Sequence, residues 1–246
     1  MKKLLLAFLV LVIMQPVNAQ KIYQRDSSGC AFNAKQLIAP ATLMTAGLSI
    51  HFAAHDSWDA SVQRFFAQNG KGNEVVPFDD WLQYAPVVMD LGLGLLGAKA
   101  ENPFLDRLIE GTLAYASLGI INGSAKYLFH TLRPNGNDYR SFPSGHTAFV
   151  FTGAELVRLE YGWGWGLAAY GMAGTVAYMR LYRNWHWLSD VIMAAGVGIL
   201  CADIGRWLLD PTRNLLGLNK VRWNLSVAPT IDPLSGTLCT QFALNF

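Results

Sequence analysis

The chain has 246 residues, of which 52% are hydrophobic and 15% are charged. This length allows one domain with a substantial core. The formal charge of only +2 lacks the basic excess that binding to nucleic acid requires, so no nucleic-acid partner is expected. The mean hydropathy of +0.24 is high for a soluble domain and modest for a chain made only of membrane spans. A compact helical bundle and a bundle set in a membrane both stay open.

Residues 1–19 have the pattern of a secretory signal peptide. Lys2 and Lys3 precede an apolar run from Leu4 to Met14, and Val17-Asn18-Ala19 forms a small-residue cleavage site. The alternative is a retained first transmembrane helix, but the run of 11 residues is shorter than the ~20 residues that span a bilayer. We therefore expect cleavage and export. Removing the two lysines from the 19 basic residues leaves 17 against 17 acidic ones.

An exported chain can form disulfides, and this one has 3 cysteines, so at least one has no partner within the chain. Cys201 lies in an apolar stretch and is expected to be a core residue. Cys30 and Cys239 lie in polar terminal segments and could pair. The sequence leaves that pairing open.

A polar lead (20–36) is followed by a region (37–212) with the apolar runs typical of helices and without the alternation of strands. The expected fold is an all-α bundle of about six helices in a single domain. The six apolar segments are Leu37–Ala54, Trp81–Ala98, Leu108–Leu128, Thr147–Leu159, Trp163–Leu181 and Leu188–Leu209. Charges such as Glu110, Glu155 and Arg158 interrupt some of them and weaken the case for membrane spans.

The tail (213–246) has a different pattern. Residues Trp223–Ala228 and Thr237–Phe246 alternate between apolar and polar side chains, and Asp232–Gly236 between them has the composition of a turn. This pattern predicts a short C-terminal β-hairpin.

The first of three polar clusters is Lys126 with Arg133-Pro134. Lys126 and Arg133 are seven positions apart, so they share a face on a continuing helix. Pro134 ends that helix and leaves Arg133 at its C-terminal end. An arginine fork and a lysine point charge are complementary ligands for phosphate oxygens, although such residues also serve as ordinary helix caps.

The second cluster is Pro143-Ser144-Gly145-His146, directly before an apolar segment. Ser144 can act as the N-cap, and Gly145 lets a ligand approach the backbone. The free amides of a helix start favour an anion, and His146 can give or take a proton there. An ordinary capped helix with one exposed histidine is the simpler alternative.

The third cluster contains Arg180, His186 and Asp190. The last two are four residues apart and are neighbours on one helical face. A carboxylate on one imidazole nitrogen fixes the tautomer and makes the other nitrogen a better nucleophile. Arg180 would bind phosphoryl oxygens, and a purely structural His–Asp pair is the alternative reading.

A metal site is not expected. His51, His55 and Asp56 have helical spacing that could suit a metal, but the sequence offers no third firm ligand beside the histidines. The three clusters contain cations, histidines and one carboxylate, and no acidic group that would hold magnesium or zinc.

Taken in order, the clusters resemble the type 2 phosphatidic acid phosphatase superfamily, which includes bacterial class A acid phosphatases and vanadium haloperoxidases. The pattern of that family is K-x6-RP, then PSGH, then SR-x5-H-x3-D. The chain matches it at every position except Met179, where the family usually has Ser. The matching residues are Lys126, Arg133, Pro134, Pro143, Ser144, Gly145, His146, Arg180, His186 and Asp190.

The resemblance implies a mechanism without metal or other cofactor. His186 would attack phosphorus, Asp190 would orient it, and His146 would protonate the leaving alcohol. The phosphoryl oxygens would be held by Lys126, Arg133, Ser144, Gly145 and Arg180.

The resemblance also implies a phosphatase acting on a membrane lipid, with lipid A as the first choice and polyprenyl diphosphate, phosphatidylglycerophosphate or phosphatidate as other candidates. Three alternatives stay open: a soluble periplasmic acid phosphatase, a vanadate-dependent peroxidase, and a non-catalytic protein that binds lipid phosphates. The expected location is the bacterial inner membrane, with the active site facing the periplasm. The oligomeric state is open.

The number of apolar segments before Arg133 conflicts with this location. After signal cleavage, three crossings would place Arg133 on the cytosolic side. We therefore expect that the segment Leu37–Ala54, which contains His51, does not span the membrane.

Overall fold

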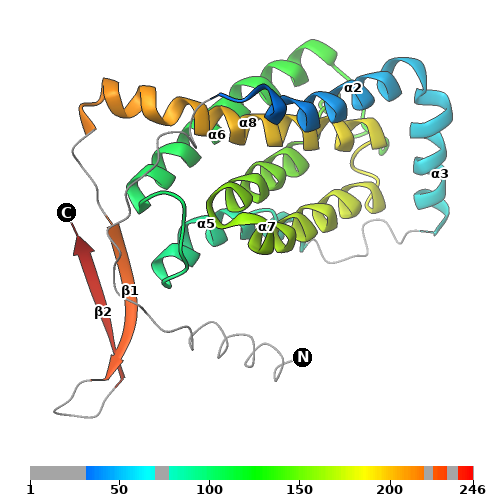
Figure 1. Ribbon diagram of the computed structural model, residues 1–246. Coiled ribbons are helices and arrows are strands. Elements are labelled where there is room, and N and C mark those ends of the chain that lie inside the picture. The colour runs from blue at the N-terminus through cyan, green and yellow to red at the C-terminus, as the bar shows by residue number, and fades with distance from the viewer. Residues whose placement is uncertain (1–31, 70–77, 219–223, 232–237, 246) are drawn as a thin grey trace.

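The computed structural model describes residues 32–69, 78–218, 224–231 and 238–245, and in them it shows a helical bundle followed by a two-stranded tail (Figure 1). The predicted all-α bundle is confirmed. The signal peptide (1–19) and Cys30 lie outside the described residues. The elements are η2 (Ala34–Leu37), α2 (Ile38–Ala53), η3 (His55–Asp59), α3 (Ala60–Asn69), α4 (Asp79–Leu82), α5 (Ala85–Leu95), α6 (Phe104–Phe129), α7 (Gly145–Tyr182), α8 (Leu188–Leu215), β1 (Asn224–Ile231) and β2 (Leu238–Asn245).

Helix α8 forms the centre of the bundle and packs against α2, α6 and α7. Close approach to its neighbours requires small residues. A Cβ on Gly198 would lie 2.6 Å from the carbonyl oxygen of Ala148, and a Cβ on Gly205 would lie 2.6 Å from that of Glu110. Cys201 is a free, fully buried thiol in this helix, as expected from its apolar surroundings.

Helix α7 contains two of the predicted apolar segments, joined by a break at Gly162. This residue has φ 76° and ψ −175°, a conformation that only glycine adopts readily. The chain folds back there, so the two halves of α7 bury a shared apolar seam. Its fully buried members are Val150, Ala154, Val157, Ala169, Ala173 and Val176.

The structure adds one helix that the apolar pattern missed. After α2 the chain turns by 90° into η3 and α3, and α3 lies across one end of the bundle (Figure 1). Helix α3 is short, and its sequence is amphipathic rather than continuously apolar, so it shows no long apolar run. The predicted segment Trp81–Ala98 also differs, because it is divided into the short α4 and the longer α5.

The tail contains two antiparallel strands that pair from Asn224↔Asn245 to Ile231↔Leu238. They lie beyond the end of the bundle opposite α3 (Figure 1). The predicted turn (232–237) and the side chain of Cys239 lie outside the described residues. The boundaries proposed for the helical domain (37–212) stay predictions, and α8 continues past residue 212 to Leu215.

Among the described helices, α8 is long and apolar enough to cross a membrane, and 78% of its apolar window is buried inside the bundle. Helices α2 and α3 would make a second candidate only as one span broken by the 90° bend. The charges that interrupt the apolar segments are paired inside the protein. Glu110 accepts from Arg206 Nε at 2.9 Å, and Glu155 accepts from Arg158 Nε at 2.7 Å.

Candidate active site

All eight residues predicted to form a site lie together at the end of the bundle that α3 crosses, hereafter the site end. They come from the end of α6, the loop after it, both ends of α7 and the start of α8. The contacts described below connect them through side chains and backbone. The eight residues are Lys126, Arg133, Ser144, Gly145, His146, Arg180, His186 and Asp190.

His186 and Asp190 form a buried dyad. His186 precedes α8, and Asp190 is the third residue of its first turn, so the two side chains meet with Nδ1 and Oδ2 3.2 Å apart. Asp190 is completely buried and His186 is only 4% exposed. Burial lowers the pKa of His186 to about 4, although Asp190 acts to raise it. The imidazole is therefore neutral at physiological pH.

The sequence analysis missed two further donors to Asp190. Its Oδ2 accepts from the backbone N–H of Trp187 at 2.8 Å and from the hydroxyl of Ser141. Ser141 is fully buried and lies 49 positions before Asp190, so no local spacing connects the two. These donors hold the carboxylate in place beside His186.

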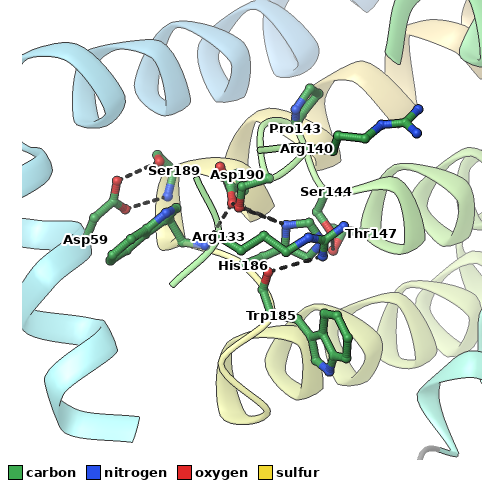
Figure 2. Close-up of polar contacts among 12 residues, drawn as sticks. Asp59, Arg133, Arg140, Pro143, Ser144, Thr147, Trp185, His186, Ser189 and Asp190 are labelled. Carbon is green, nitrogen blue, oxygen red and sulfur yellow. Dashed lines mark hydrogen bonds and ion pairs between the residues drawn. The ribbon is translucent and has the colours of Figure 1, made fainter. Parts of the chain in front are cut away.

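Arg133 faces the other nitrogen of His186. Its NH1 lies 3.1 Å from His186 Nε2, and Figure 2 shows the imidazole between Arg133 and Asp190. Because a guanidinium only donates, Nε2 presents its lone pair to Arg133. Asp138 accepts from Arg133 Nε at 2.8 Å and fixes the guanidinium. The nitrogen of His186 that does not face Asp190 thus lies directly beside a guanidinium.

The Pro143–His146 segment enters α7 as predicted, with Ser144 as the N-cap. Within the described residues the Ser144 side chain accepts no hydrogen bond from the first amides of the helix, and its Oγ accepts from Thr147 Oγ1 at 3.0 Å. The first amides of α7 are therefore available to an anion, with the positive end of the helix dipole behind them. A Cβ on Gly145 would meet the protein no closer than 3.8 Å, at Asn122 Nδ2.

Lys126 braces this segment. Its Nζ donates to the carbonyl oxygens of Arg140 at 2.7 Å and of Pro143 at 2.6 Å. Burial and the nearby Arg133 lower its pKa to about 8. Its charge lies beside the site, while its hydrogen bonds hold the loop that leads into α7.

An acidic pair on α4 connects Arg180 with His146. Asp80 Oδ1 lies 2.9 Å from Arg180 NH1 and 3.1 Å from His146 Nε2, and the buried Asp79 lies 3.2 Å from the same guanidinium nitrogen. Burial and the charge of Arg180 lower the pKa of His146 to about 4, although Asp80 raises it. The sequence analysis missed both carboxylates, because Asp80 precedes Arg180 by 100 positions.

The ring of Trp185 packs against three arginine side chains. The guanidinium carbons of Arg133, Arg180 and Arg183 lie 5.3, 5.7 and 5.9 Å from its ring centroid. The Nε atoms of Arg180 and Arg183 are buried and have no hydrogen-bond partner within the described part of the chain. Buried donors of this kind favour a bound anion.

The histidines outside the dyad have structural contacts. His55 Nδ1 lies 2.9 Å from Asp59 Oδ2, and Asp59 accepts from the N–H and hydroxyl of Ser189 at the start of α8. The ring of His51 packs on Phe142 with centroids 4.4 Å apart. The described residues contain no group of three or more His, Cys, Asp or Glu side chains arranged to hold a metal ion.

Part of the chain is similar to known proteins. Residues 108–211 match the PAP2 superfamily, so this region, which is less than half of the chain, is similar to that family. The matched region includes all eight site residues, while Asp79 and Asp80 precede it.

Two individual relatives were found. The chain is 36% identical over 146 residues to a protein named lipid A 1-phosphatase from Porphyromonas gingivalis, and this match covers 57% of the chain and 33% of that protein. The chain thus matches only a third of its curated relative. The crystal structure of Aquifex aeolicus LpxE overlaps 60% of this chain and 93% of its own, at 23% identity and a TM-score of 0.46.

Proposed function

We propose that the protein is a metal-independent phosphatase that removes a phosphate group from a membrane lipid through a phosphohistidine intermediate. The single observation that carries this proposal is the position of His186. Its Nδ1 is held by the buried Asp190 and its Nε2 lies 3.1 Å from Arg133. A neutral, oriented imidazole beside a phosphate-binding cation is the arrangement that nucleophilic attack on phosphorus requires.

In the first step, the Nε2 lone pair of His186 forms a bond to phosphorus as the bond to the ester oxygen breaks. His146 in its protonated form, which the negative charge of the bound phosphate favours, gives its proton to the departing alkoxide, so an alcohol leaves. Arg133, Arg180 and the first amides of α7 balance the charge on the phosphoryl oxygens as it spreads in the transition state.

In the second step, His146 accepts a proton from water, and the resulting hydroxide attacks the phosphohistidine. Phosphate leaves, and the Nε2 lone pair of His186 is restored. Asp190 stabilises the cationic imidazole of the intermediate. The cycle needs no group beyond the residues of this chain.

Lipid A is the proposed substrate, supported by the similarity to a protein named lipid A 1-phosphatase. We place the enzyme at the bacterial inner membrane with its site facing the periplasm, because the sequence begins with the pattern of a signal peptide. Signal cleavage and this orientation are part of the proposal.

Phosphate release from a panel of substrates tests the proposal. The panel contains lipid A, polyprenyl diphosphate, phosphatidate and p-nitrophenyl phosphate. We expect release to be fastest from lipid A, to continue in EDTA and to be inhibited by vanadate. Release that requires added magnesium, or that survives the substitution His186→Ala, would refute the mechanism. Preference for another lipid would refute the choice of lipid A alone.

A further inference from the structure

Exposed aromatic side chains gather at the site end of the bundle. Each is at least half exposed, from 52% for Tyr139 to 86% for Tyr127. We call this set the aromatic rim: Phe52, Trp58, Phe65, Trp81, Tyr127 and Tyr139.

Four rim residues are direct neighbours in sequence of residues at the site. Trp58 precedes Asp59, which binds the start of α8. Trp81 follows Asp80, which contacts Arg180 and His146. The rim therefore approaches the site from at least two sides.

The other side is formed by the end of α6 and the loop after it. Tyr127 follows Lys126, whose Nζ holds that loop. Tyr139 follows Asp138, which binds Arg133. Four of the six rim residues therefore lie on chain segments that also supply contacts to the site.

Helix α3 contributes a surface of its own. One face packs on the bundle, where the rings of Phe66 and Tyr178 lie 5.5 Å apart. The other face exposes Phe65 and Arg64. A short amphipathic helix that crosses the end of a bundle (Figure 1), with a basic and an aromatic residue outward, has the character of a helix that lies along a membrane surface.

The opposite end of the bundle differs in composition. Its exposed apolar residues include several leucines, and two exposed aromatic residues, Phe32 and Trp163, are among the described residues there. The leucines are Leu96, Leu108, Leu167, Leu215 and Leu216. Aromatic rings concentrate at the headgroup level of a bilayer, and the uneven distribution over the two ends therefore gives the molecule an orientation.

We propose that the aromatic rim sits in the headgroup region of the lipid leaflet that carries the substrate. Cationic side chains lie next to the aromatic rim in the sequence, among them Lys126, Arg133 and the exposed Arg140. Their positive charge complements an anionic phosphate headgroup. The lipid phosphate then reaches His186 while its acyl chains stay in the bilayer. This inference rests on the proposed function, and it specifies that the substrate is taken directly from a membrane surface.

The test compares a rim variant with a matched control in the full chain. The rim variant carries Trp81→Ser and Tyr127→Ser, at residues 79% and 86% exposed, and the control carries Leu215→Ser and Leu216→Ser at the opposite end, at 86% and 58%. Three quantities are measured: co-sedimentation with phosphatidylcholine–phosphatidylglycerol vesicles, phosphate release from lipid A in those vesicles, and release from p-nitrophenyl phosphate.

We expect the rim variant to bind vesicles and to hydrolyse lipid A about tenfold less, because two large apolar surfaces no longer enter the headgroup region. Its release from p-nitrophenyl phosphate should equal that of the unaltered chain, which also shows that it folds. A variant with Trp81→Phe and Tyr127→Phe should retain vesicle binding, and the leucine control should change none of the three quantities.

Equal vesicle binding by the rim variant and the unaltered chain would overturn the inference, as would an equal loss in the leucine control. If the unaltered chain hydrolyses neither substrate, the proposed function fails, and vesicle binding still decides the role of the rim.

Discussion

The two ends of the bundle both bury charged side chains, and they differ in how those charges are arranged. At the far end, opposite the site, Arg206 binds Glu110 at 2.9 Å and Glu160 at 2.6 Å, and none of the three is more than 4% exposed. At the site end, His146 and Asp80 meet with side chains that are 36% and 41% exposed. The far-end group is closed to solvent, whereas the site group opens to the surface.

The side-chain types differ in the same way. The far end combines one guanidinium with two carboxyl groups, which are complementary in geometry. The site end adds two histidines, a side chain that can donate or accept a proton. The comparison teaches that burial of charge alone does not mark a functional site. Proton-transferring groups with access to solvent are the better indication of such a site.

The largest expected effect is the loss of activity in the variant His186→Ala. Without the nucleophile, phosphate release should fall by about 10⁴-fold or more, while the unfolding temperature should stay close to that of the unaltered chain. The control His130→Asn changes an exposed histidine with φ 44° to a residue that tolerates this conformation and should keep full activity. Comparable losses in both variants would contradict the role given to His186.

At the far end, a substitution should change the stability of the protein and leave its catalytic rate unchanged. Arg206→Ala leaves Glu110 and Glu160 buried without their shared cation, so the free energy of unfolding should fall by about 3–5 kcal/mol. Denaturant unfolding measures this change. Arg64→Ala, at an exposed residue that contacts Ser61, should cost less than about 1 kcal/mol. A specific loss of kcat in folded Arg206→Ala would break the distinction between the two ends.

A smaller effect is expected from Ser141→Ala, which removes one donor from Asp190. The carboxylate then orients His186 less firmly, so kcat should fall about tenfold with little change in KM. Thr112→Ala provides the control, since among the described residues that hydroxyl bonds within its own helix, to the Leu108 carbonyl. A change confined to KM would show that Ser141 acts on substrate binding instead.

The smallest expected effect is a shift in pH dependence. Asp80 raises the pKa of His146, so Asp80→Asn should lower that pKa further. His146 must be protonated to act as the acid, and the alkaline limb of kcat/KM should therefore move to lower pH. Asp80→Glu should restore the limb. An alkaline limb that stays in place or moves upward in Asp80→Asn would contradict the contact between Asp80 and His146.

Sequence reasoning could group the eight candidate residues because their motifs are local. Lys126 and Arg133 share one stretch of chain, and His186 and Asp190 share one helical turn, so spacing alone places them together. Asp80 and Ser141 could not be found in this way. Each reaches the site through a tertiary contact, and a single acidic residue or serine has no distinguishing pattern in an isolated sequence.

The fold was predictable where apolar runs are long, as in α6 and α8. Two features were not. Gly162 was one of 23 glycines, and only the packed structure shows that the chain reverses there. The charged residues that interrupt the apolar segments, such as Glu110 and Glu155, form ion pairs with residues on another helix or on a later turn of the same helix. These charged residues are therefore part of the core, which the sequence pattern does not show.

Trapping the covalent intermediate tests the central claim most directly. The full chain is mixed with substrate labelled with ³²P in the transferred phosphate, quenched in alkali and separated on a denaturing gel. The account predicts label on the chain that is stable in alkali and lost in acid, as for a phosphorus–nitrogen bond, and absent from His186→Ala. Label that persists in His186→Ala, or turnover without any labelled chain in a rapid quench, would contradict it.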